Sequence, residues 1–441
     1  MSIATYHTPL RRHLVLWIFI FCFFISAPWL VLYTAGYRYS QAKHSLEPSG
    51  TLIVDSVPSG AQVFLDGTLI QTTPITIKQV SGGSHLIQVT KNGYSSWQKT
   101  LSLVDGQVTF ANQIHLWKTN QPQLVYAQNV THLVANSNGQ DIAIISHDAT
   151  SSWLGVWTPT NGLTFNKPLT HSSSTTFSVQ WDEVGGNQLL VQGEGVSSSV
   201  FWFDTTNPQT PPPLPAGTYH WSKLRNGLFG ARPGFLIDAH SSSGWLIKQI
   251  AVPKTVLDRD GQDEIFTSST RQFISFAPSI QPTTTTTAQL PKGSWHFDED
   301  HNDYLIGQDA TRLFLINRNS SKTLSGAFII SDHADPELYQ TPTNVLIHNL
   351  HEVWMWDGIN YPTLVTRQSN PIINAVFDQK EQTIFVATAS QIYAIELDQR
   401  DGQLTTPLAT FDHIDDLTIL QNTLYIAGTL HAQRGIWEYS L

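Results

Sequence analysis

Residues 14–33 form a run of twenty residues without a charged side chain. At 1.5 Å per residue, a helix of this length is about 30 Å long, which matches the hydrocarbon core of a bilayer. Aromatic residues of the kind that settle at membrane interfaces lie in the run or just after it: Trp17, Trp29, Tyr33, Tyr37 and Tyr39. The sequence therefore predicts a transmembrane helix over residues 14–35 that crosses the lipid bilayer once.

Two alternatives to an anchor were weighed. A core helix of a soluble domain is disfavoured because the run is apolar on every side. A cleaved signal peptide is the closer rival, but its best small-residue site, Ser26-Ala27, is followed by Pro28 and has Ile25 at the −3 position. We therefore expect an uncleaved signal anchor. Cys22 lies inside the run and is the only cysteine, so no intramolecular disulfide can form.

The charges beside the run predict its orientation. Arg11 and Arg12 precede it closely, and the first 13 residues contain no acidic side chain, whereas Arg38 and Lys43 follow the run. The positive-inside tendency places residues 1–13 in the cytoplasm. A linker over residues 36–49 and the bulk of the chain then lie outside the cell membrane.

The composition favours β-structure in that external part. Charged residues make up 13% of the chain and aromatic residues 11%, with 14 tryptophans. Such a mixture suits strands and polar turns better than surface helices, which draw on lysine, glutamate and alanine. The formal net charge is −10, so the chain lacks the excess of basic residues that is typical of nucleic-acid-binding proteins. We expect a mainly β fold without a nucleic-acid partner.

Residues 50–117 predict a small all-β domain of about six short strands. Val57-Pro58-Ser59-Gly60 is a turn, since proline fixes φ and glycine accepts positive φ. Asp66-Gly67 is a strong hairpin signal after an alternating strand over residues 61–65. Gly82-Gly83 and Asn92-Gly93 predict two further turns.

These elements resemble the PEGA domain family. The Pro-Glu-Gly-Ala motif of that family corresponds here to Pro58-Ser59-Gly60-Ala61, with serine in place of glutamate. The later elements fall in the order of the family: Asp66-Gly67, Thr73-Pro74, Gly83-x-His85 and Gly93-Tyr94. The resemblance implies a compact β-sandwich in a prokaryotic cell-envelope protein, and it implies no catalysis. Asp66, His85 and Tyr94 are then expected to be turn, strand and packing residues.

Residues 120–441 repeat one pattern of apolar strands separated by polar turns. Units start near residues 134, 179 and 219, and again near 376 and 417, at spacings of about 40–45 residues, which is typical of four-stranded propeller blades. The interval from 219 to 295 holds one large blade or two. We expect a β-propeller of seven blades, with six or eight possible. A strand near residues 124–127 is expected to complete the last blade and close the ring.

The sequence contains no complete catalytic or metal-binding motif of the kinds considered below. His351-Glu352 lacks the second histidine of a zinc-protease helix. Two acidic loops have oxygen ligands at the alternating spacing that calcium prefers, but neither completes a calcium-binding loop. Their weak candidate ligands are Asp258, Asp260, Asp263, Asp298 and Asp300. We expect surface turns, no cofactor and no catalytic residue.

The sequence thus predicts a membrane-anchored, non-catalytic binding or scaffold protein of the prokaryotic cell envelope. The propeller would present a face to an envelope protein or to a cell-wall glycan. The alternative is an extracytoplasmic hydrolase with its site in the propeller funnel, for which convergent carboxylates would be needed. A sensor role would require a signalling partner through the membrane helix.

Overall fold

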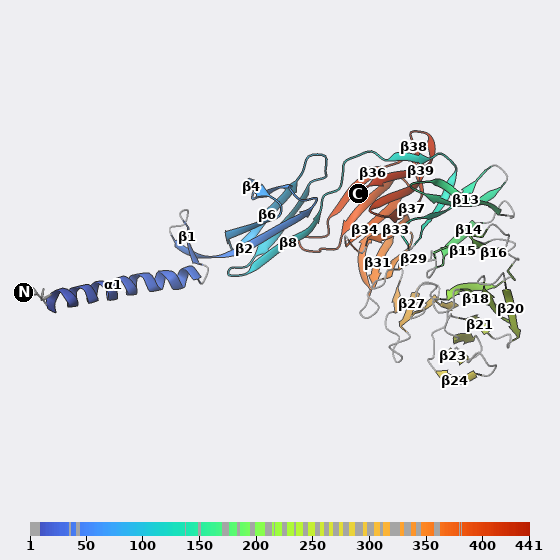
Figure 1. Cartoon of the computed structure of the whole chain (residues 1–441), viewed down its shortest axis with the longest axis horizontal. Coiled ribbons are helices and arrows are strands. Elements are labelled where there is room, and N and C mark those ends of the chain that lie inside the picture. Colours follow the sequence, from blue (N-terminus) through green and yellow to red (C-terminus); the bar gives the residue numbers. More distant parts are fainter. Residues whose placement is uncertain are drawn as a thin grey trace, which may run out of the picture. The chain divides into compact units, whose positions relative to one another are not determined.

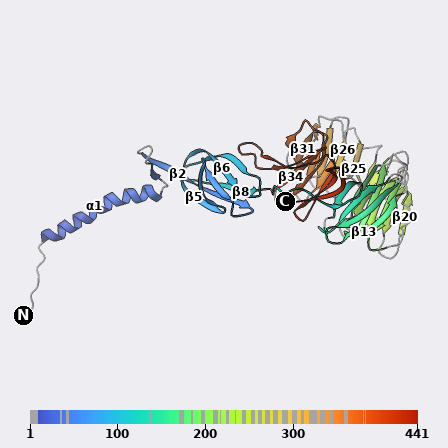
Figure 2. The same ribbon diagram turned by 90° about the horizontal axis from the view of Figure 1, so that it is seen from above.

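A computed structural model divides the chain into two compact units. The first comprises Met1–Thr119 together with Asp398–Leu404, and the second comprises Asn120–Leu397 and Thr405–Leu441. The structure describes residues 9–441 apart from residues 35–36, 41–44, 137, 149–150, 170–175, 183–185, 195–198, 208–213, 216, 223–226, 233–234, 241–245, 252–255, 260–263, 268–272, 277–281, 287–293, 298–303, 309–311, 318–326, 330–336, 341–344, 357–361, 379 and 381. Figures 1 and 2 show the strands of each unit from two directions.

The apolar run forms the helix α1, Pro9–Thr34 (Figure 1). Within it, His13–Thr34 is long and apolar enough to cross a membrane, and none of this segment is buried against the rest of the protein. Pro28 lies inside the helix, as a membrane helix tolerates. The predicted apolar helix is therefore confirmed. Its apolar side chains are not covered by the described part of the protein, as expected of a helix that crosses a lipid bilayer.

The remainder of the first unit is a two-sheet β-sandwich. One sheet has the order β4 (Thr68–Thr72), β3 (Gln62–Leu65), β6 (Gly83–Thr90) and β7 (Trp97–Leu103). The other has β2 (Ser45–Val57) in its middle, between antiparallel β5 (Ile75–Ser81) and parallel β8 (Val108–His115), while β1 (Tyr37–Ser40) pairs with the first residues of β2.

The core of this sandwich lies between the inner faces of its two sheets. Buried residues alternate along the strands, as they must when one face of each sheet is covered. Leu52 and Val54 of β2 meet Val63 of β3 and Ile87 and Val89 of β6 in one hydrophobic cluster. The predicted compact β-sandwich is confirmed.

The second unit is a succession of small antiparallel sheets. Among the described residues these sheets number eight, and each is built from strands that are consecutive in the chain, except for the last. The first four sheets contain β10 (Val130–Ala135), β11 (Ile142–His147), β12 (Ser152–Thr158) and β13 (Gly162–Leu169); β14 (Thr176–Trp181), β15 (Gln188–Glu194) and β16 (Ser199–Asp204); β17 (Thr218–Ser222), β18 (Gly227–Arg232), β19 (Phe235–His240) and β20 (Leu246–Ala251); and β21 (Val256–Arg259), β22 (Glu264–Thr267), β23 (Phe273–Phe276) and β24 (Pro282–Thr286).

The other four sheets follow the same plan. They contain β25 (Ser294–Phe297), β26 (Tyr304–Gln308), β27 (Arg312–Asn317) and β28 (Ala327–Ile329); β29 (Glu337–Gln340), β30 (Val345–His348), β31 (Glu352–Trp356) and β32 (Thr363–Arg367); β33 (Ile372–Asp378), β34 (Thr383–Thr388), β35 (Gln391–Glu396) and β36 (Thr405–Thr410); and β37 (His413–Leu420), β38 (Thr423–Leu430) and β39 (Gln433–Ser440) with β9 (Gln123–Tyr126).

The closing strand was predicted correctly. β9 pairs antiparallel with β39, with Tyr126 opposite Ile436 and Leu124 opposite Trp437. Gly435 permits this approach, because a Cβ atom there would lie 2.2 Å from the main-chain oxygen of Tyr126. The last sheet thus takes its fourth strand from the beginning of the unit.

Apolar layers join neighbouring sheets face to face. One such layer combines residues of the first sheet, among them Ile142 and Trp157, with Tyr425 and Ile436 of the last sheet. The rings of Trp157 and Tyr425 lie 5.4 Å apart in an edge-to-face contact. The first and last sheets therefore share a core, which is the contact that a closed ring of blades requires.

The number of sheets differs from the seven blades that we favoured. The interval between residues 219 and 295 contains two described sheets, β17–β20 and β21–β24, so the described part of the chain has eight. The 76 residues between these two starts fit one long repeat or two short ones, so sequence spacing alone left one blade or two open. The blade count of a complete propeller stays a prediction.

Candidate functional site

The Pro58-Ser59-Gly60-Ala61 motif builds a turn that is tied to the Thr73-Pro74 element. Gly60 has a φ of +77°, a conformation that glycine adopts without strain. Its NH donates to the main-chain oxygen of Thr73 over 2.8 Å, and the NH of Thr73 donates to Ala61 over the same distance. The buried Thr73 hydroxyl also accepts from the NH of Ala61. The two sequence motifs therefore form one hydrogen-bonded unit, and Ser59 lies in its exposed part.

Asp66 and His85, two residues of the motifs, contact each other in the structure. Asp66 and Gly67 both have positive φ, 51° and 80°, in the tight turn between β3 and β4. His85 Nδ1 lies 2.7 Å from Asp66 Oδ2, and His85 Nε2 lies 2.8 Å from the main-chain oxygen of Ser81. Both ring nitrogens therefore lie within hydrogen-bond distance of an oxygen acceptor. The hydrogen bond from His85, opposed by partial burial and helped by the NH of Leu86, lowers the pKa of Asp66.

The remaining motif residues also have structural roles. Gly83 and Gly93 have positive φ, 135° and 81°. The NH of Tyr94 donates to Lys91, and the Tyr94 ring packs against the core of the sandwich. The geometry thus agrees with turn and packing roles for these residues.

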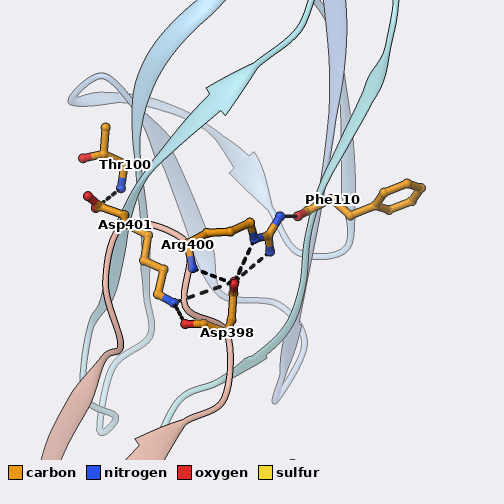
Figure 3. Close-up of polar contacts among 6 residues, drawn as sticks. Thr100, Phe110, Asp398, Arg400 and Asp401 are labelled. Atoms are coloured by element: carbon orange, nitrogen blue, oxygen red, sulfur yellow. Dashed lines mark hydrogen bonds and ion pairs between the residues drawn. The ribbon is translucent and has the colours of Figure 1, made fainter. Parts of the chain in front are cut away.

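Residues 398–404, which connect β35 to β36, belong to the first unit. This connection, here called the 398–404 loop, lies along β7 and β8 of the sandwich (Figure 3). Leu404 packs against the sandwich core as a partly buried side chain. The first unit is therefore discontinuous in sequence, and a segment almost 300 residues later completes it.

Lys99 is the central residue of this contact. It is 2% exposed and stands on the core-facing side of β7, between Trp97 and Leu101. Its Nζ donates to the main-chain oxygen of Asp398 over 2.6 Å and lies 3.7 Å from the Asp398 carboxylate. A buried ammonium is costly unless it is paired, so the loop supplies the charge that lets lysine occupy this position.

Arg400 and Asp401 cover the main chain of the two neighbouring strands. Arg400 Nη1 donates to the main-chain oxygen of Phe110 on β8 over 2.7 Å, and its other nitrogens hold the Asp398 carboxylate. The main-chain NH of Thr100 on β7 donates to Asp401. Within the described part of the chain, β7 pairs with β6 and β8 pairs with β2 and neither has a second partner strand, so these bonds satisfy main-chain groups on strand edges (Figure 3).

The electrostatics of the loop favour an ionised Asp398. Burial by itself raises the pKa of this carboxyl, but hydrogen bonds from Arg400 and the positive charges of Arg400 and Lys99 outweigh it and hold the pKa below its usual range. The cluster is saturated by internal partners. It is suited to joining two segments of chain and does not resemble a reactive centre.

The sequence did not lead us to predict this cluster, although β7 carries one signal of it. Along β7 the inward positions are Trp97, Lys99, Leu101 and Leu103, so a lysine interrupts an apolar alternation. A charge on the buried face of a strand predicts a partner elsewhere. The identity of this partner could not be predicted, because nothing near Lys99 in the sequence points to residue 398.

A second buried carboxylate lies in the second unit, where three strands contact one another. Asp416 on β37 accepts from Asn374 Nδ2 of β33 over 2.6 Å and from the NH of Leu133 of β10 over 2.8 Å. His132 Nδ1 of β10 lies 2.6 Å from the same carboxylate, and the NH of Leu417 also donates to it. The first, seventh and eighth sheets therefore meet at one carboxylate.

These contacts lower the pKa of Asp416. Burial raises it, but the charge and hydrogen bond of His132, with the donors from Leu133 and Asn374, outweigh burial. His132, Asn374 and Asp416 each follow a register shift in their strand pairing, between residues 130 and 132, 372 and 374, and 414 and 416. They thus occupy corresponding places in three sheets. With four donors on two oxygens, the carboxylate has no lone pair left for general-base work.

The predicted metal candidates lie largely outside the described residues. Asp260, Asp263, Asp298 and Asp300 are not among them, and Asp258 is described by its backbone alone, in β21. Arg11 and Arg12 lie in α1, where only the backbone is described. Within the described part of the chain, no group of three or more histidine, cysteine, aspartate or glutamate side chains is placed to hold a metal ion.

The comparisons with known proteins agree with the first unit. Residues 49–120 match the family model of the PEGA domain. The resemblance carried by Pro58-Ser59-Gly60-Ala61 and the following motifs is confirmed for this segment. No curated protein matches the chain. The chain also aligns with one from a solved structure titled "Crystal Structure of Mitotic Checkpoint Complex", with 12% identity, 74% of this chain and 96% of that chain covered, and a TM-score of 0.46. That likeness is too low to support an argument.

Proposed function

We propose that this protein is a membrane-anchored binding or scaffold protein of a prokaryotic cell envelope, with residues 1–13 in the cytoplasm and the bulk of the chain outside. One observation carries the proposal: a membrane-length helix with exposed apolar side chains leads, within about fifteen residues, into a PEGA domain. The helix supplies an anchor, and the domain that follows belongs to the extracytoplasmic side. Arg11 and Arg12 support the same orientation.

The buried charges support binding over catalysis. Lys99 and Asp416 are two buried charged groups whose polar contacts described above lie within the fold. An active carboxylate or ammonium must be free to exchange a proton or to contact a substrate. The alternative, a hydrolase with its site among the sheets of the second unit, therefore has no specific observation in its favour.

The sheets of the second unit are the proposed binding part. Rigid, closely packed sheets hold their connecting loops in fixed positions, which suits recognition of a large partner. The first unit then connects the membrane helix to this binding part along the chain. Its proposed partner is an envelope protein or a cell-wall glycan.

The full-length protein in mild detergent tests this proposal. It would be incubated with purified cell-wall glycan and, separately, with solubilised membrane proteins, and heat-unfolded protein would serve as the matched control. Retention on glycan, or capture of one defined envelope protein, supports the proposal. Release of soluble sugars or peptides from the glycan would indicate the hydrolase instead, and retention by neither material would contradict the proposal.

A further inference from the structure

The outer face of the β5-β2-β8 sheet carries apolar side chains beside a lysine. Leu52 of β2 and Ile77 of β5 contact the core of the sandwich, so the residues on either side of them face outward. The strand registers give two outward rows across the sheet, Lys78-Thr51-Val108 and Thr76-Ile53-Phe110. Apolar residues therefore lie next to one another on β2 and β8, with a lysine in the same rows.

These outward residues are unusually exposed for their type. Val108 is 48% and Phe110 is 49% exposed, and Val104, in the turn before β8, is 49% exposed. The Phe110 ring points away from the 398–404 loop (Figure 3). Among the described residues outside α1, Phe110 is the most exposed aromatic side chain. Several exposed apolar side chains at one place indicate an interaction surface, here called the β8 patch: Ile53, Lys78, Val104, Val108 and Phe110.

A short connection joins the β8 patch to the end of α1. Two residues, 35 and 36, separate α1 from β1, and Tyr37 of β1 pairs with Pro48 of β2. Pro48 precedes Thr51 by three residues, so this path from the end of α1 to Thr51 spans at most about 25 Å. Since β8 runs parallel to β2, Val108 at its start lies beside Thr51, at the end of the sandwich that the chain enters from α1.

We propose that the β8 patch contacts the headgroup surface of the bilayer that α1 crosses, which rests on the proposed function in that α1 is taken as a membrane anchor. Aromatic rings such as Phe110 settle between the headgroups and the acyl chains, and valine and isoleucine add apolar area. The ammonium of Lys78 suits anionic headgroups, while its stem lies along apolar surface. The short connection keeps the bilayer at high effective concentration, which an independent partner lacks.

Fluorescence quenching of the full-length protein in lipid vesicles tests the proposal. In a Cys22→Ser background, Val108→Cys carries a bimane label, and the vesicles contain phosphatidylethanolamine, phosphatidylglycerol and a lipid with a nitroxide on its headgroup. Val57→Cys is the matched control, because Val57 is 53% exposed but lies at the other end of β2. We expect quenching at position 108 to exceed quenching at position 57 at least about threefold.

Removal of the Phe110 ring gives a second readout. Phe110→Gln should lower quenching of the label at position 108 at least about twofold, whereas Phe110→Leu and Val57→Gln should leave most of it. Because both side chains are exposed, these variants should keep the wild-type thermal melt.

Three outcomes would overturn the proposal. The first is equal quenching at positions 108 and 57, and the second is quenching at position 108 that Phe110→Gln leaves unchanged. The third is a label at position 108 that is shielded in native membranes but not in pure lipid vesicles, which would assign the β8 patch to a protein partner. A chain that alkaline extraction removes from the membrane would instead contradict the anchor, and with it the proposed function.

Discussion

The Nζ of Lys99 donates to the main-chain oxygen of Asp398 over 2.6 Å, although the two residues are 299 positions apart in the chain. Lys99 stands where the alternation of β7 requires an inward side chain, and Asp398 begins the 398–404 loop. The pairing makes that loop a component of the PEGA-domain unit. It follows that the first unit requires residues from beyond position 397 for its full stability.

Lys99→Met should destabilise the first unit. Methionine keeps much of the side-chain volume but leaves the Asp398 oxygens short of a donor, which costs about 1–3 kcal/mol. Hydrogen exchange measured by mass spectrometry should show faster exchange in residues 398–404 and in β7. The control is Lys78→Met, because Lys78 is exposed on β5. Unchanged protection of the 398–404 loop in Lys99→Met would contradict its assignment to this unit.

Asp416→Asn should destabilise the second unit. The amide nitrogen of asparagine would face donors from Leu133, Asn374 or His132, so one buried contact becomes repulsive. We expect a loss of about 2–4 kcal/mol in chemical unfolding. Asp412→Asn, at an exposed residue near the start of the same sheet, should cost less than about 1 kcal/mol. Equal losses for the two variants would show that the buried network has no special role.

Gly435→Ala should loosen the closing strand. A Cβ atom at this position would lie 2.2 Å from the main-chain oxygen of Tyr126 and 2.6 Å from the Leu124 side chain, so β9 must move away from β39. Proteolysis under native conditions should then cut near residues 120–128 sooner than in the wild type. Gln433→Ala, on an exposed residue of the same strand, is the control. Wild-type resistance in Gly435→Ala would argue against closure by β9.

Stability should fall in acid through Asp398 and Asp416. Both carboxyls have a pKa below the ordinary value in the folded protein, so both bind protons more readily in the unfolded chain. Their contribution is therefore complete above the unfolded pKa of about 3.9 and is lost as the pH falls through the folded pKa. Urea unfolding between pH 6 and pH 3 should show this loss. Asp398→Asn and Asp416→Asn should each flatten the pH profile, and an unchanged slope in both would refute the assignment.

Local chemistry made part of this structure predictable. Gly60, Asp66 and Gly67 occupy the turns that their residue types require, and the apolar run at residues 14–33 became a single helix. The strand near residues 124–127 was predicted to close the last sheet because the final repeat contained only three strands, and β9 occupies that place. In each case a short segment and one physical rule were sufficient.

Contacts between distant segments were not predictable in the same way. A charged lysine at the inward position 99 indicates that an oppositely charged or polar partner lies nearby. The sequence does not identify this partner as Asp398, because the two residues come together only in the folded chain. The Asp416 network joins three sheets through residues at corresponding bulges, and a bulge leaves no mark in the sequence that spacing can detect. The number of sheets was also open, because the interval from residue 219 to residue 295 is long enough for one large blade or two and no clear repeat start marks its middle.

We propose that α1 anchors the chain and leaves the residues after it outside the cell. Labelling of intact cells with a membrane-impermeant maleimide, in a Cys22→Ser background, tests this topology. Leu350→Cys carries the reporter thiol at an exposed residue of the second unit, and Ser2→Cys carries it before α1. We expect labelling of the first variant in intact cells and of the second only after lysis. Labelling of Leu350→Cys only after lysis would contradict it.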